Sequence, residues 1–224
     1  MKLPFSADEF FAVFARYNEA VWPAQAVLTG LAVVAALLAW RPSRTRDRVI
    51  SGILAALWAW MGIVYHYWFF RAINPAAVLF AAAFVVQAVL FAAFGVIGGR
   101  LRFRVNARAS GLTAGILIVY ALVVYPLVGQ AAGHVYPAVP TFGLPCPTTI
   151  FTLGMLIAAL PGVPKSALLI PLVWVAVGTA AALQLGVPQD FGLTVAGLVA
   201  VGFSFAVPKG SVGRKASGYA MEER

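Results

Sequence analysis

Seven stretches of apolar residues, most of them about as long as a membrane is thick, dominate this sequence. The hydrocarbon core of a bilayer is about 30 Å thick, and about 20 residues of α-helix cross it. The sequence therefore predicts an all-α polytopic membrane protein with seven transmembrane helices. Their predicted ranges are Ala20–Trp40, Val49–Phe70, Pro75–Gly98, Gly111–Gln130, Thr148–Leu160, Ser166–Leu185 and Phe191–Val207.

The composition excludes the main alternatives to a membrane protein. Hydrophobic residues make up 62% of the 224 residues and charged residues only 10%, whereas a soluble domain averages about 45–50% and about 25%. A soluble enzyme of this length could not bury so much apolar surface, and disorder needs low hydrophobicity and high charge. We expect one seven-helix membrane domain over residues 1–207.

The positions of the charged residues predict the orientation. Thirteen Lys and Arg residues fall after the first, third and fifth stretches and in the C-terminal segment, against three elsewhere. Loops rich in Lys and Arg stay in the cytoplasm. The N-terminus is therefore predicted outside, and residues 208–224 form a basic cytoplasmic tail. The cytoplasmic arginine blocks are expected to contact anionic lipids.

Two segments do not fit a simple bundle of spans. The fifth stretch has only 13 residues between prolines, so the sequence leaves open whether it crosses the membrane completely. Before the first span, Ser6 and Glu9 have the spacing of a capping box, and aromatic residues follow on one helix face. Residues 1–19 are predicted to be a helix in the outer interface, or alternatively a lead-in to the first span.

Several motifs together resemble a known family, and the similarity extends from about Pro4 to Val207. The resemblance is to bacterial integral membrane proteins classified only as a domain of unknown function, and it implies a bacterial plasma membrane location but no activity. The motif around Cys146 is the most specific. The motifs are Pro4–Phe11, Tyr17–Gln25, Trp58–His66, Ala72–Pro75 and Pro140–Thr152.

Most polar residues of the spans are predicted near the outer side, which indicates an outward-facing pocket. Polar groups are costly in hydrocarbon, so each is a candidate functional residue. Residues 131–148, which are rich in proline and glycine but not hydrophilic, are predicted to fold over the pocket as a lid. The candidate ligand-binding residues are Glu19, His66, Arg71, Tyr125, Gln130, His134, Cys146 and Thr149.

A metal site and an organic or anionic ligand both remain open from the sequence. Imidazole and thiolate ligands suit copper or zinc, so His66, His134 and Cys146 are candidate ligands. No predicted span contains a lysine that could hold retinal, and no phosphate-binding loop motif is present for a nucleotide. We expect no nucleic-acid partner.

The sequence thus favours a transporter-like membrane protein, or one that binds a small ligand or ion, through an outward-facing pocket. The first alternative is a structural accessory subunit that packs against a second copy or a membrane partner through its Ala- and Gly-rich spans. The second is a membrane metalloenzyme with His66 as a general base. Enzymatic activity is the less favoured reading, because no triad of catalytic residues is apparent.

Overall fold

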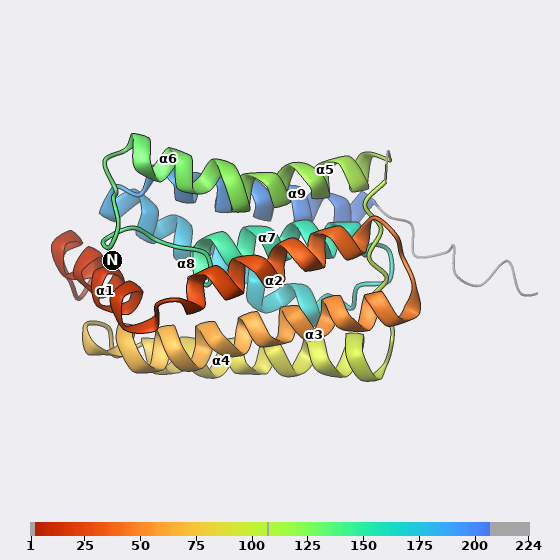
Figure 1. Ribbon diagram of the computed structural model, residues 1–224, viewed down its shortest axis with the longest axis horizontal. Coiled ribbons are helices and arrows are strands. Elements are labelled where there is room, and N and C mark those ends of the chain that lie inside the picture. The colour runs from red at the N-terminus through yellow and green to blue at the C-terminus, as the bar shows by residue number, and fades with distance from the viewer. Residues whose placement is uncertain (1–2, 107, 207–224) are drawn as a thin grey trace, which may run out of the picture.

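The computed structural model describes residues 3–106 and 108–206, and these residues fold almost entirely as helices, with no strand among them (Figure 1). The predicted C-terminal tail lies outside the described residues. The α-helices are α1 (Ala7–Val21), α2 (Ala24–Ala39), α3 (Arg44–Trp60), α4 (Ala77–Phe91), α5 (Ala109–Val119), α6 (Tyr125–Ala131), α7 (Pro145–Ala158), α8 (Lys165–Leu185) and α9 (Phe191–Ala206).

Short π-helical and 3-10 turns join several of these helices into longer rods. Within residues 3–106 and 108–206, five rods are long and apolar enough to cross a membrane. A sixth candidate is the pair α1 and α2, which would be one broken span because it is bent by 86°. The five rods are Arg44–Ala72, Ala77–Ile97, Ala109–Ala131, Lys165–Leu185 and Pro188–Ala206.

The short helix α7 lies at the centre of the bundle. It packs against α2, α5, α8 and α9, and every residue in it except Cys146 is buried (Figure 1). Its 14 residues span about 21 Å at 1.5 Å per residue. Thr152 is paired within the bundle, because its hydroxyl donates to the Thr148 carbonyl at 2.7 Å and accepts from Trp58 Nε1 at 3.0 Å.

Helix α1 lies across one end of the bundle rather than along it (Figure 1). The chain turns at Trp22 and Pro23, because proline lacks the N–H that a continuous helix would need there. One face of α1 is buried through Phe10, Phe14 and Tyr17, and the ring centroids of Phe10 and Phe14 are 4.5 Å apart. The predicted capping box is confirmed: Glu9 N donates to Ser6 Oγ, and Ser6 N donates to the Glu9 carboxylate.

This capping box predicts a pH dependence at the start of α1. The two hydrogen bonds from Ser6 hold the pKa of the exposed Glu9 carboxyl below its ordinary value of 4.5. A lowered pKa in the folded state stabilises α1 above pH 4.5, and this contribution is lost as the pH falls through the folded pKa. Hydrogen exchange at the amides of residues 7–10 should therefore show falling protection below pH 4.5, after correction for intrinsic exchange. Glu9→Gln keeps a neutral acceptor and should remove the pH dependence.

The predicted helix boundaries differ from the observed ones where local chemistry outweighs hydropathy. The rod that corresponds to the second predicted span begins at Arg44 instead of Val49, because Ser43 caps the helix by accepting from Arg46 N at 3.2 Å. The central helix begins at Pro145 instead of Thr148, since proline is favoured in the first helical turn. Hydropathy alone predicts neither the Ser43 cap nor the helix start at Pro145.

Candidate functional site

A cavity of about 270 Å³ lies at the end of the bundle that carries α1. We call it the aromatic cavity. Aromatic rings from α1, from the turns that follow α3, from α4 and from α8 form much of its wall. Its mouth lies near Leu3, Ala180 and Gln184, which are at least partly exposed. The rings that line it are Phe5, Phe10, Phe14, Tyr65, Phe70, Phe80, Tyr125 and Trp174.

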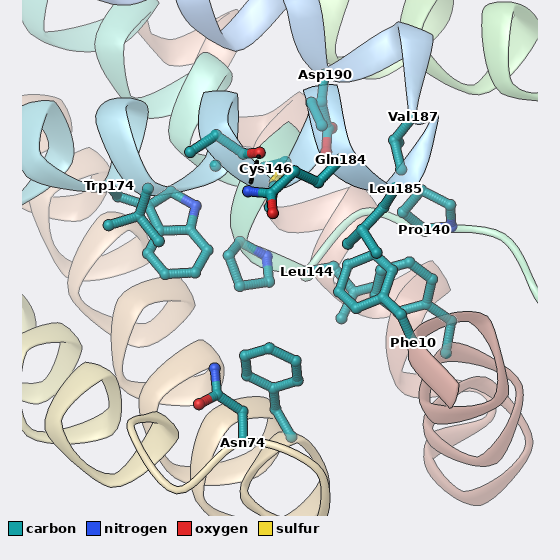
Figure 2. Close-up of a pocket in the computed structure, with 18 of the residues that line it drawn as sticks. Phe10, Asn74, Pro140, Leu144, Cys146, Trp174, Gln184, Leu185, Val187 and Asp190 are labelled. Atoms are coloured by element: carbon teal, nitrogen blue, oxygen red, sulfur yellow. Dashed lines mark hydrogen bonds between the residues drawn. The ribbon is translucent and has the colours of Figure 1, made fainter. Parts of the chain in front are cut away.

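One wall of the aromatic cavity is polar (Figure 2). Asp190 is only 5% exposed, and its Oδ1 accepts a hydrogen bond of 2.6 Å from the Tyr125 hydroxyl. The Cys146 thiol lies beside the Asp190 carboxylate. The buried Trp174 Nε1 has no hydrogen-bond partner, and Figure 2 shows the indole turned toward Cys146. We call these four side chains the polar corner.

The turn that carries Asp190 is held on both sides. Asp190 ends the 3-10 turn Pro188–Asp190, directly before α9. The preceding residue, Gln189, accepts from the Tyr120 hydroxyl through its carbonyl at 2.8 Å, and its Nε2 lies 3.2 Å from His134 Nδ1. These contacts fix the carboxylate at the cavity wall, and the described residues that line this wall include no lysine, arginine or histidine.

A second cavity of about 740 Å³ lies between α2, α6 and the segment that follows α6. We call it the α2–α6 groove. Gln25, Gln130 and His134 line it, and the buried Gln25 Oε1 there has no hydrogen-bond partner. The groove and the aromatic cavity are adjacent, because both are lined by Tyr125, Pro140 and Pro147.

The segment between α6 and α7 is fastened to the end of α1. The fully buried Asn18 donates through Nδ2 to the carbonyls of Pro137 and Val139, at 2.6 and 2.8 Å, and accepts from the Thr141 hydroxyl at 2.7 Å. Residues of this segment line both cavities. The predicted lid, residues 131–148, thus lies beside the aromatic cavity, but α1 covers it as well.

The structure distributes the predicted site residues over several places. Tyr125 and Cys146 line the aromatic cavity, and Gln130 and His134 line the α2–α6 groove. Thr149 is buried with an unpartnered hydroxyl but lines neither cavity.

Two charged residues that were predicted to bind a ligand lie on the surface instead of in a pocket. Glu19 is exposed on α1. Arg71 is also exposed, and its guanidinium lies 4.1 Å from the centre of the Tyr67 ring. Neither residue lines the aromatic cavity or the α2–α6 groove.

The predicted metal ligands His66, His134 and Cys146 do not form one site. His66 is enclosed by aromatic rings, with Phe84 and Trp174 at centroid distances of 4.6 and 5.1 Å, and neither ring nitrogen has a hydrogen-bond partner. His134 instead packs on Phe11. Within the described residues, no three His, Cys, Asp or Glu side chains are grouped as metal ligands.

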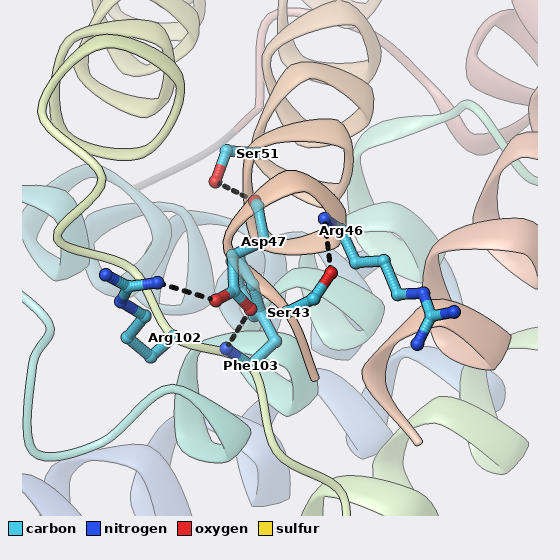
Figure 3. A network of polar contacts seen from close by, with 6 residues as sticks. All are labelled: Ser43, Arg46, Asp47, Ser51, Arg102 and Phe103. Carbon is cyan, nitrogen blue, oxygen red and sulfur yellow. Dashed lines mark hydrogen bonds and ion pairs between the residues drawn. The ribbon is translucent and has the colours of Figure 1, made fainter. Parts of the chain in front are cut away.

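One of the arginine blocks makes a structural contact at the opposite end of the bundle (Figure 3). The Asp47 carboxylate accepts from Arg102 Nη1 at 3.2 Å and from the Phe103 backbone N–H at 3.0 Å. Ser51 donates to the Asp47 carbonyl at 2.8 Å. These contacts fasten the segment after α4 to the first turn of α3.

Comparison with protein families assigns the chain to one of them. A family model matches residues 7–209, which is most of the sequence. The chain belongs to DUF6064, a family of unknown function. The resemblance to an uncharacterised family is thereby confirmed. No curated protein and no solved structure matches this DUF6064 chain.

Two members of the polar corner, Asp190 and Trp174, are absent from the predicted site. Asp190 directly precedes the last predicted span, so hydropathy places it in a loop although it is buried in the DUF6064 fold. One signal in the sequence could have indicated Asp190: acidic residues are scarce, with only seven Asp and Glu residues in the chain. Trp174 is one of six tryptophans, and no sequence pattern separates it from those that face outward.

Proposed function

We propose that this protein is an integral membrane protein that binds a small, mainly apolar molecule in the aromatic cavity. One observation carries the proposal: a cavity with apolar walls converges on a few buried polar groups at a single corner. Ligand sites in proteins commonly have this composition, in which apolar walls supply contact area and few polar groups fix the orientation.

The membrane arrangement that we propose has seven spans, with the N-terminus outside and the C-terminus in the cytoplasm. In addition to the five long rods, α2 and the enclosed α7 would serve as the remaining spans. The arginine-rich segments next to α3 and α5 lie at the end opposite α1 (Figure 1). Under the positive-inside rule, α1 and the mouth of the aromatic cavity then face outward in a bacterial plasma membrane.

A transporter-like role is compatible with this arrangement, since the aromatic cavity opens toward one end and adjoins the α2–α6 groove. Among the described residues, three π-helical stretches belong to the long rods: Met61–Phe69 and Tyr120–Val124 lie within them, and Ala92–Ile97 ends one of them. Such stretches are frequent at functional sites and places where helices deform. The first of them contributes Tyr65 to the cavity wall.

Filling the cavity should abolish binding of a neutral probe. Ala181 is half-buried on α8 and lines the cavity, so Ala181→Phe would place a ring inside it. Wild-type protein in lipid nanodiscs should bind neopentylbenzene, a compact neutral hydrocarbon, saturably and with one site per chain. Equilibrium dialysis against empty nanodiscs measures this binding, and the Ala181→Phe variant should lose at least tenfold in affinity.

The matched control is Ala176→Phe, on an exposed position of the same helix that lines neither cavity. This variant should bind the probe as the wild type does. No saturable binding to the wild type, or equal binding to both variants, would contradict the proposal and favour a structural accessory subunit instead.

A further inference from the structure

We propose that the aromatic cavity is specific for an organic cation, such as an amphipathic amine, which its Asp190 carboxylate and aromatic rings recognise together. This inference rests on the proposed function, since it names the chemical class of the ligand that the same cavity binds. Among the lining residues that belong to the described part of the chain, Asp190 is the one acidic residue, and none is basic.

The environment of Asp190 is costly for a carboxylate without a counterion. The side chain is 5% exposed, and within residues 3–106 and 108–206 no cationic group forms an ion pair with it. Its described hydrogen bond comes from the neutral Tyr125 hydroxyl and occupies Oδ1. A buried charge needs a partner of opposite charge, and an ionisable group inside a membrane protein is by default a functional candidate. A cationic ligand supplies the missing partner.

The remaining walls suit the same class of ligand. Cations are attracted to aromatic rings by the ring quadrupole, and Tyr65, Phe80 and Trp174 line the cavity with Asp190. Figure 2 shows the Asp190 side chain directed toward Cys146 and Gln184, on the cavity side of its turn. An anion would meet the carboxylate with no basic residue to offset the repulsion, so the wall also discriminates by charge.

Trp174 adds a requirement on the uncharged part of the ligand. Its buried Nε1 makes no hydrogen bond in the described structure, and the group beside it is the thiol of Cys146, which is only a weak acceptor. A buried donor that stays unpaired is unfavourable, and a ligand oxygen would remove this cost. The ligand is therefore an organic cation with an apolar body and an acceptor, such as an ether or hydroxyl oxygen, close to the charge.

A pair of isosteric probes tests the charge preference directly. Benzyltrimethylammonium has the shape of neopentylbenzene, with a quaternary nitrogen in place of a carbon. Wild-type protein in nanodiscs of zwitterionic lipid should bind the cation at least tenfold more tightly, after subtraction of uptake by empty nanodiscs. Asp190→Asn keeps an acceptor for Tyr125 but removes the charge, so the two probes should then bind about equally.

The controls separate this inference from the proposed function. Asp8→Asn removes an exposed carboxylate from α1 and should leave both affinities unchanged. Unchanged binding of neopentylbenzene to Asp190→Asn shows that the variant is folded. If it does not fold, the comparison of the two probes on the wild type still decides the question. Equal affinities on the wild type overturn the cation inference alone, whereas absence of binding by both probes overturns the proposed function as well.

Discussion

Replacing Asp47 with alanine is expected to destabilise the protein by about 3 kcal/mol. A hydrogen bond between a charged group and a buried donor contributes about 1.5–3 kcal/mol. A partly exposed ion pair adds up to about 1 kcal/mol. The variant leaves the Phe103 N–H unpaired at a fully buried residue. Arg102 loses its counterion too, but its side chain is 35% exposed, so water compensates for part of that loss. Titration with sodium dodecyl sulfate in mixed micelles measures the free energy of unfolding.

Asp47→Asn is the matched control for this prediction. The amide oxygen still accepts from the Phe103 N–H, and only the attraction to Arg102 is lost. The expected cost is about 1 kcal/mol, as for a partly exposed ion pair. Equal losses for the alanine and asparagine variants would show that the ion pair, and not the backbone hydrogen bond, holds the segment after α4.

The second large effect is expected for Asn18→Ala, which should cost about 3 kcal/mol, at about 1 kcal/mol for each of three hydrogen bonds. The variant leaves the carbonyls of Pro137 and Val139 and the Thr141 hydroxyl without their partner. The segment between α6 and α7 should then exchange its amide hydrogens faster, which hydrogen exchange with mass spectrometry detects peptide by peptide.

Two further variants make the Asn18 prediction specific. Thr141→Val removes one of the three bonds and should cost about 1 kcal/mol. Arg16→Ala changes an exposed residue of the same helix and should affect neither stability nor exchange. If exchange between α6 and α7 is unchanged in Asn18→Ala, α1 does not fasten that segment.

The helices themselves were largely predictable from the sequence, because burial in lipid or in a core needs long apolar stretches. The predicted span Gly111–Gln130 corresponds to the rod Ala109–Ala131 within two residues at each end. The capping box of Ser6 and Glu9 was predictable for a different reason, since its bonds join residues three positions apart. Local chemistry of this kind is read from the sequence without knowledge of the fold.

The candidate site was only partly predictable, because it depends on which helix faces meet. Tyr125 and Cys146 were predicted to line the pocket. His66 was predicted there too, because its depth in the membrane alone does not distinguish it from them. In the structure it packs among Phe84, Trp174 and other rings. Such packing depends on the rotation of each helix about its axis. This rotation cannot be predicted for a span that has apolar residues on every side. Asp190 was missed for another reason, since it lies just before the last predicted span and its burial in the turn Pro188–Asp190 depends on the fold.

The turn of nearly 90° between α1 and α2 could also not be predicted from the sequence. Pro23 indicates an interruption but gives no direction for the chain that precedes it. The direction comes from contacts distant in sequence, such as those of Asn18 with Pro137 and Val139. Two segments therefore line the aromatic cavity at this end of the bundle, α1 and the segment between α6 and α7, and the sequence indicated only the second of them.

The enclosed position of α7 also constrains the order in which the chain can assemble. In chain order α7 precedes α8 and α9, yet both pack against it. During synthesis α7 is made while two of its neighbours do not yet exist, so its apolar surface is first covered by lipid or by the insertion machinery. Biogenesis can be completed only after the last helix has been inserted, and truncation before α9 should leave the centre of the bundle open to degradation.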